Sequence, residues 1–176
     1  MDAEDAGPAG DKEELIPRLP EMEDLVSLCR RLNELGARYI VIGGFAIIIN
    51  GLARATSDVD ILLAADIENE ARVFKALEIL SDKAVLELEP GDVAKYTVVR
   101  VADEITVDLM KAACGVEYDE ASGHVVMMKI QGTNIPFASP RLLWRMKAPT
   151  RRDKDVPDLA FLREYFRQHG EEPPAI

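Results

Sequence analysis

The chain has 176 residues, of which 48% are apolar and 30% are charged, and its formal net charge is −11. This length and composition predict a single folded domain with a sizeable core. The negative charge argues against broad electrostatic binding to nucleic acid or to an anionic membrane surface, and no apolar run reaches the roughly 18 residues of a membrane span. The chain begins with acidic residues, so no signal peptide is predicted and a cytoplasmic location is expected.

The first predicted elements follow an acidic, Gly- and Pro-containing stretch, residues 1–14, which is expected to be a disordered tail. Apolar residues at helical spacing predict a helix over 21–35, which Gly36 ends. A short apolar run predicts a buried strand over 39–42, and a second run, apolar on all sides, predicts a buried helix over 45–50.

The middle of the chain is predicted to supply most of the strands. Apolar and β-branched runs predict strands over 59–63, 84–88, 94–101 and 105–110, with a helix over 67–80. The last two of these strands are close enough in sequence to form a hairpin through residues 102–104.

The C-terminal part is predicted to contain one more hairpin and two helices. Strands over 124–130 and 134–138 flank a turn, and Ser139 and Pro140 then have the residue types that begin a helix. Asp155 is expected to cap a final helix that runs to about residue 168.

Together these elements predict an α/β (α+β) domain built around one sheet. The domain is expected to cover residues 15–169, and residues 170–176 are expected to form a short C-terminal tail.

A pair of acids, Asp58 and Asp60, stands at the start of the strand predicted over 59–63. Residues two apart in a strand share a face, so both carboxylates point the same way while Val59 and Ile61 point into the core. Two carboxylates this close repel each other unless a cation lies between them, and Mg²⁺ is commonly held by such oxygen ligands together with substrate phosphates. An ordinary surface pair is the alternative.

A third acid, Asp108, interrupts the otherwise apolar strand predicted over 105–110. Burying an isolated carboxylate costs free energy, so Asp108 is expected to have a partner. The pair at 58 and 60, with a bound metal ion, would supply one. The alternative is that Asp108 lies at the solvent edge of its strand.

Gly43 and Gly44 separate the first predicted strand from the helix that follows. Paired glycines allow backbone N–H groups to approach a phosphate closely. A side chain at position 44 is expected to block that approach and to leave the fold largely intact. The alternative is that the two glycines form only a turn.

Basic residues crowd into fourteen positions near the C-terminus, and Lys147 and Arg152 are the candidates for contacts with an anion. A solvated basic face is the alternative. The members of this group are Arg141, Arg145, Lys147, Arg151, Arg152 and Lys154.

The order of these motifs resembles the DNA polymerase β-like nucleotidyltransferase superfamily. The shared pattern is a strand, Gly-Gly, a helix, then Arg-x-Thr-x-Asp-x-Asp on a strand and a later strand with one Asp. The form of these motifs, with the stretches 135–140 and 152–159, is most similar to small bacterial nucleotidyltransferases related to abortive-infection (type IV) toxins. The resemblance covers about residues 37–165, and Phe45 stands where many relatives have Ser.

The resemblance implies a nucleotidyltransferase fold, with a mixed β-sheet flanked by helices and with C-terminal helices. It implies that Asp58, Asp60 and Asp108 are catalytic and bind Mg²⁺, or Mn²⁺ in its place. The residues that it implies for nucleotide binding are Gly43, Gly44, Arg54, Thr56, Lys147 and Arg152.

The implied activity is transfer of a nucleoside monophosphate from a nucleoside triphosphate to a hydroxyl group. The acceptor stays open between an RNA end, a protein and a small molecule such as an antibiotic. A place in a toxin–antitoxin pair, with a cognate antitoxin as partner, is a further implication. The alternative is a catalytically inactive module that retains the fold and binds a nucleotide or a partner protein.

Overall fold

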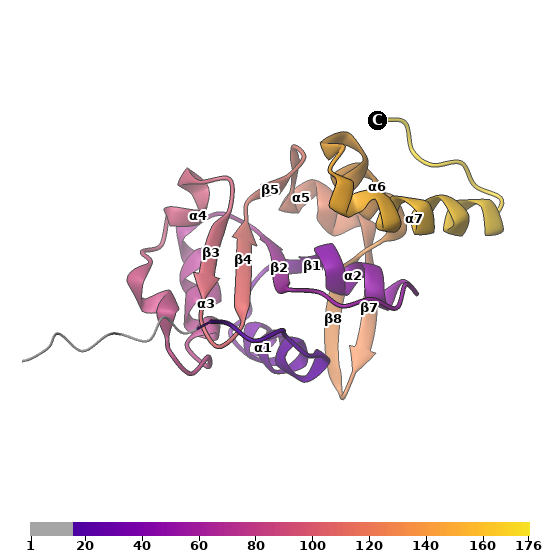
Figure 1. Ribbon diagram of the computed structural model, residues 1–176. Coiled ribbons are helices and arrows are strands. Elements are labelled where there is room, and N and C mark those ends of the chain that lie inside the picture. The colour runs from indigo at the N-terminus through magenta and orange to yellow at the C-terminus, as the bar shows by residue number, and fades with distance from the viewer. Residues whose placement is uncertain (1–15) are drawn as a thin grey trace, which may run out of the picture.

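The computed structural model describes residues 16–176, so the tail predicted over 1–14 lies outside the described residues. Figure 1 shows the elements in their arrangement. In chain order they are α1 (Met22–Glu34), β1 (Tyr39–Ile42), α2 (Gly43–Ile49), β2 (Asp58–Leu63), α3 (Ile67–Leu77), α4 (Asp92–Lys95), β3 (Val99–Ala102), β4 (Thr106–Met110), β5 (Ala112–Ala113), β6 (Val116–Glu117), α5 (Tyr118–Ala121), β7 (Val125–Ile130), β8 (Thr133–Ala138), α6 (Pro140–Lys147) and α7 (Val156–Gln168).

The centre of the fold is a six-stranded mixed sheet with the strand order β3-β4-β2-β1-β8-β7. Strand β2 runs parallel to β4 and antiparallel to β1, while β1 runs parallel to β8. Two antiparallel hairpins, β3–β4 and β7–β8, form the outer parts of the sheet, and β5 and β6 form a separate ribbon. This architecture confirms the predicted α/β class with a mixed sheet.

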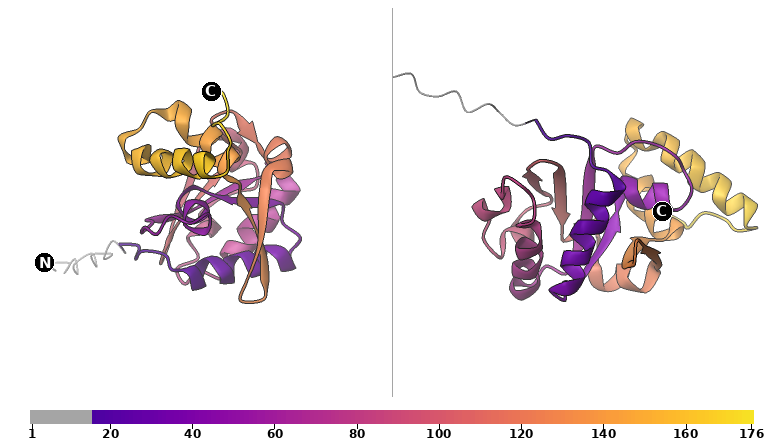
Figure 2. Two further views of the ribbon diagram at one scale, coloured as in Figure 1. Left: turned by 90° about the vertical axis from the view of Figure 1, so that its right-hand side faces the viewer. Right: turned by 90° about the horizontal axis from the view of Figure 1, so that it is seen from below.

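Helices pack against the sheet in two groups. Helix α1 contacts α3 and β8, whereas α2 contacts β1, β2 and α6. The C-terminal helices α6 and α7 lie side by side at the end of the molecule opposite α1 (Figures 1 and 2). Among residues 16–176, no helix combines the length and the apolar character that crossing a bilayer requires.

The predicted N-terminus of α6 is confirmed in detail. The Ser139 side-chain oxygen accepts a hydrogen bond from the Leu142 backbone N–H at 3.3 Å, and Pro140 occupies the first helical position. The predicted start of α7 is only half right. Asp155 precedes the helix, but its side chain accepts no capping hydrogen bond, because it is turned toward three other partners instead.

One predicted strand is wrong and a second begins too early. The range 84–88 contains a short 3₁₀ helix, Ala84–Glu87, and the range 94–101 begins with the end of α4, so that β3 starts only at Val99. The helix predicted over 67–80 also ends earlier, at Leu77.

Buried acids explain why these segments leave the extended conformation. Glu70, which is fully buried on α3, accepts hydrogen bonds from the backbone N–H groups of Gly91, Val93 and Ala94 at 2.6, 3.2 and 3.1 Å. Asp103 does the same for the segment before the 3₁₀ helix, where it accepts from Asp82 and Ala84. These side chains replace the hydrogen bonds that a strand would have made with a neighbour.

We expect Glu70→Gln to lower the free energy of unfolding by about 2–3 kcal/mol. In the wild type three backbone N–H groups donate to the Glu70 carboxylate, whereas the amide of glutamine would face some of these donors with an N–H group of its own. Glu68→Gln is the matched control on the same helix; its side chain is 77% exposed, so a change below about 0.5 kcal/mol is expected. Urea unfolding of the three proteins measures both. Equal losses in the two variants would contradict a special role for Glu70.

Candidate functional site

Two neighbouring strands, β2 and β4, bring the acids together. In the register of the sheet, Asp60 on β2 lies opposite Asp108 on β4 in the parallel pair and opposite Ile42 on β1 in the antiparallel pair. Adjacent residues of paired strands share a face, as do residues two apart in one strand, so Asp58 joins them. Each of the three carboxyl groups offers an oxygen that lies within 4.8 Å of the other two.

Gly43 makes room for one of these carboxylates. Its φ is +62°, and a Cβ atom at this position would lie 2.0 Å from Asp60 Oδ2. Both the backbone conformation and the close approach therefore require glycine here.

Gly44 is enclosed from another side, and this corrects one expectation. A Cβ atom at Gly44 would lie 2.4 Å from Thr56 Oγ1 and 2.7 Å from Thr56 Cβ. A larger residue at position 44 would therefore displace the loop that holds Thr56, and would not leave the fold intact as expected from the sequence.

The acids, the two glycines and the basic segment line a single cleft of about 820 Å³. Every site residue proposed from the sequence lies on its wall. The wall also contains charged residues that the sequence reasoning did not select. The lining residues with polar side chains or glycine are Gly43, Gly44, Arg54, Thr56, Ser57, Asp58, Asp60, Arg100, Asp108, Lys147, Arg152, Lys154 and Asp155.

The loop between α2 and β2 is tied to the C-terminal helix. Arg54 forms an ion pair with Asp158 on α7: its Nη2 atom donates a hydrogen bond to Oδ2 at 2.9 Å, and its Nε atom lies 2.8 Å from Oδ1. The Thr56 hydroxyl donates to the Asp58 carbonyl oxygen at 3.1 Å. The loop therefore presents Arg54 and Thr56 to the cleft in fixed positions, although Arg54 is already neutralised by an acid.

Lys147 is buried at the end of α6 and lies between two acids of the C-terminal region. Its Nζ atom is 3.0 Å from Asp155 Oδ1 and 3.0 Å from Asp158 Oδ2. Asp155 also accepts hydrogen bonds from Arg152 Nε at 2.7 Å and from the Thr150 hydroxyl at 3.0 Å. Burial alone would raise the pKa of Asp155, but the hydrogen bonds and charges of these partners, Lys147 first among them, bring it below its usual range.

Of the two candidate cations of the basic segment, only Arg152 is solvent-accessible. Its side chain is 50% exposed, whereas the Lys147 side chain is 9% exposed. Lys154 lines the same part of the cleft and is exposed. Arg152 and Lys154 are therefore the basic residues of this segment that can reach a ligand in the cleft without leaving a buried acid unpaired.

Arg100 is the main site residue that sequence reasoning missed. It lies on β3 directly opposite Asp108, and its guanidinium donates to both oxygens of that carboxylate, from Nε at 2.8 Å and from Nη2 at 2.7 Å. The same Nη2 atom is 3.5 Å from Asp58 Oδ2. The acid cluster therefore already has one positive neighbour, which the register of the β3–β4 hairpin supplies.

The electrostatic strain of the cluster is concentrated on Asp60. Burial, together with the charges of Asp58 and Asp108, raises the pKa of Asp60 to about 7, and the more distant charges of Lys147 and Lys154 offset only part of this. In the absence of a cation, Asp60 is thus on the border between its protonated and ionised forms at neutral pH.

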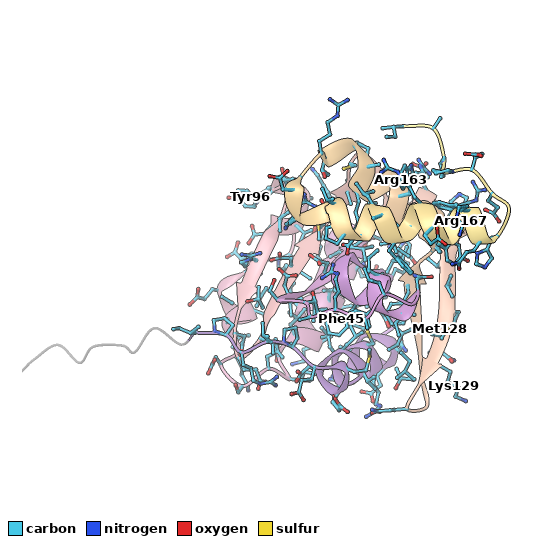
Figure 3. The ribbon with its side chains drawn as sticks, turned by 45° about the vertical axis from the view of Figure 1, so that its right-hand side comes forward. Phe45, Tyr96, Met128, Lys129, Arg163 and Arg167 are labelled. Carbon is cyan, nitrogen blue, oxygen red and sulfur yellow. The ribbon has the colours of Figure 1, made fainter. Side chains whose placement is uncertain are left out.

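Phe45 follows the two glycines but does not reach the cleft. It is 3% exposed and belongs to the hydrophobic core, and Figure 3 shows its position in the body of the protein, below α7. Its side chain therefore makes no polar contact in the cleft, and at this turn only the backbone of Gly43 and Gly44 faces a ligand.

Comparison with known proteins gave structural matches only. No family model and no curated protein matched the sequence. A candidate nucleotidyltransferase from Thermotoga maritima is similar at 15% identity, covering 83% of this chain and 92% of that one, with a TM-score of 0.49. An antigenic nucleotidyltransferase-like protein from Paracoccidioides brasiliensis is similar at 18% identity, covering 82% and 74%, with a TM-score of 0.50. The second match indicates that the chain has a nucleotidyltransferase-like fold.

The raised pKa of Asp60 predicts the direction in which stability changes with pH in the presence of a chelator. The unfolded carboxyl ionises near pH 4 and the folded one only near pH 7, so its contribution to stability is lost as the pH rises between these values. Asp60→Asn removes this loss. We expect the free energy of unfolding of the variant, relative to that of the wild type, to increase by about 2–4 kcal/mol from pH 4 to pH 8.

Urea unfolding at a series of pH values measures this gain. Asp153→Asn, an exposed acid near the cleft that does not line it, is the control and should follow the wild type at each pH. A difference between Asp60→Asn and the wild type that stays constant across the range would contradict the prediction.

Proposed function

We propose that this chain is a metal-dependent nucleotidyltransferase, which moves a nucleoside monophosphate from a nucleoside triphosphate to a hydroxyl group. The observation that carries the proposal is the meeting of the three carboxylates within 4.8 Å, on the wall of a cleft that also contains Gly43 and Gly44. The nucleotidyltransferase-like fold agrees with it but does not carry it, because likeness of fold does not establish activity.

The donor set fits a hard divalent cation. All three side chains of the cluster offer carboxylate oxygens, which are the ligands that Mg²⁺ and Mn²⁺ prefer, and no nitrogen or sulfur donor is part of it. Burial and the charges of Asp58 and Asp108 raise the pKa of Asp60, so a cation bound at the cluster would stabilise its ionised form. Asp58, Asp60 and Asp108 would hold the ion, which would neutralise phosphate charge and lower the pKa of the acceptor hydroxyl.

The walls of the cleft suggest how a triphosphate would lie. The backbone at Gly43 and Gly44 leaves space beside the acids because neither position has a side chain, and the Thr56 hydroxyl borders that space. Arg152 and Lys154 line the same cleft, are exposed and carry positive charge. Lys147 and Arg54 support this wall through their ion pairs with Asp155 and Asp158.

The proposed reaction is a single displacement at the α-phosphorus. The acceptor oxygen forms a bond to the α-phosphorus. The bond from the α-phosphorus to the oxygen that joins it to the β-phosphorus breaks, and pyrophosphate leaves with that electron pair. The hydroxyl proton passes to a carboxylate oxygen of Asp108, which faces the cleft from the neighbouring strand. Asp58 and Asp60 would hold the ion beside the reacting phosphate, where it would help to keep the reacting groups in line.

The acceptor is the open part of the proposal, and an RNA end, a protein side chain and a small molecule each have a hydroxyl group. The net charge of −11 favours a neutral or cationic acceptor over a polyanion, because the field of the protein repels RNA beyond the reach of the local basic segment. A small cationic molecule such as an aminoglycoside-type antibiotic fits this charge best. A toxin–antitoxin role would instead require an RNA or protein acceptor.

The activity is tested by incubating the protein with each α-labelled nucleoside triphosphate, Mg²⁺ and fractionated cell extract or a panel of aminoglycosides. We expect label to be transferred to one class of acceptor. Asp58→Ala and Asp60→Ala should each reduce transfer about a hundredfold or more. Asp153→Ala should leave it unchanged, since Asp153 does not line the cleft. Magnesium-dependent binding of a triphosphate without transfer to any fraction would instead identify an inactive nucleotide-binding module.

Arg152 provides a separate test of the nucleotide position. If it contacts a triphosphate, Arg152→Gln should weaken nucleotide affinity about tenfold, and the loss should shrink at high salt. Arg151→Gln is the matched control, because Arg151 is the adjacent arginine, is exposed and does not line the cleft. Calorimetric titration of both variants measures the difference. Equal affinities would mean that the basic segment is a solvated surface.

A further inference from the structure

The contacts of Arg100 allow a more specific statement about how the acid cluster is kept intact before it binds a cation. Three carboxylates within 4.8 Å of one another repel each other, and a fold that holds them together must compensate that repulsion. Within residues 16–176, Arg100 is the only basic side chain that forms an ion pair with a member of the cluster.

The guanidinium of Arg100 occupies the Asp108 oxygens that a metal ion would need. Both oxygens accept hydrogen bonds from it, at 2.8 and 2.7 Å, and the bonds are the parallel, two-pronged type that matches a carboxylate best. The same group approaches Asp58 at 3.5 Å, so it bridges β2 and β4 from the side of β3. A cation bound by all three acids would compete with Arg100 for the same oxygens.

The Arg100 side chain can also move away from Asp108 into solvent. Its side chain is 61% exposed, whereas the carboxylate that it holds is 8% exposed. Its position on β3, the edge strand of the sheet, leaves one side of it without a neighbouring strand. Moving the guanidinium into solvent therefore breaks hydrogen bonds but leaves no buried cation without a partner.

We propose that Arg100 is a positioning residue that takes the place of the metal ion in the metal-free protein. It holds Asp108 and Asp58 together while the site is empty of a cation, and it is exchanged for the ion when the ion binds. This inference rests on the proposed function, since it requires that the acid cluster bind a divalent cation.

The exchange has two measurable consequences. In the presence of a chelator, Arg100→Gln should lower the midpoint of thermal unfolding by about 2–4 °C, because the cluster loses its positive neighbour. At saturating Mg²⁺ or Mn²⁺ the midpoints of the variant and the wild type should coincide. Mn²⁺ affinity, measured by calorimetry, should be about fivefold to tenfold tighter in the variant, because no guanidinium has to be displaced.

Two further variants make the result specific. Arg100→Lys keeps the charge without the two-pronged contact and should give intermediate values. Arg167→Gln is the matched control: Arg167 contacts Glu164 in the same two-pronged way on α7, where Figure 3 shows it, and it does not line the cleft. Arg167→Gln should lower the metal-free midpoint of thermal unfolding by less than Arg100→Gln does, and it should leave the affinity for Mn²⁺ unchanged.

The outcomes separate this inference from the proposed function. If the wild type binds Mn²⁺ and Arg100→Gln binds it with equal or weaker affinity, Arg100 is not displaced and the inference is wrong while the metal site stands. If neither protein binds Mn²⁺ or Mg²⁺, the metal requirement of the proposed function fails, and the inference fails with it.

Discussion

Mutual repulsion among three carboxylates is the constraint around which this protein is organised. Asp58, Asp60 and Asp108 are placed together by the register of β2 and β4, so the fold cannot form without bringing their charges close. The surrounding structure compensates this in three ways. The Asp60 carboxyl shifts its pKa upward, Arg100 pairs with Asp108, and the more distant charges of Lys147 and Lys154 act across the cleft.

The second organising feature is a chain of ion pairs between the C-terminal helices and the cleft. Arg54 and Lys147 share the carboxylate of Asp158, and Lys147 in turn shares Asp155 with Arg152. Among the described residues, no buried side-chain nitrogen or oxygen atom lacks a partner. The chain of ion pairs thus positions α7 against the loop before β2, so that a helix distant in sequence determines the shape of the cleft.

Local sequence patterns were sufficient to predict the fold class, the central strands and the face of β2 that carries the acids. They failed where a contact distant in sequence decides the conformation. The segments at 84–88 and 94–98 are apolar enough for strands, but the buried carboxylates of Glu70 and Asp103 hold their backbones in turns. Nothing in the local pattern shows that these acids point inward.

Arg100 was missed for a related reason, which is a small error in register. A hairpin link at 102–104 pairs Arg100 with Thr106, whereas the link at 103–105 that the structure adopts pairs it with Asp108. Shifting the pairing by two residues on one strand is enough to change which side chains meet. For the basic segment, the sequence showed the cations but not the acids that neutralise them, because Asp155 and Asp158 meet Lys147 only in the folded chain.

Because Gly43 and Asp60 are in contact, evolution can replace the aspartate before the glycine but not the glycine before the aspartate. While Asp60 is present, any side chain at position 43 collides with its carboxylate, so the glycine cannot be replaced first. Loss of the acid to alanine removes the contacts with the carboxylate at 2.0 and 2.7 Å, but a Cβ atom at position 43 would still lie 2.9 Å from the Cβ atom of residue 60. Position 43 therefore stays restricted by this contact as well as by the cost of a left-handed backbone, about 1 kcal/mol. A lineage that abandons metal chemistry is therefore expected to lose the aspartate first and to retain the glycine long afterwards.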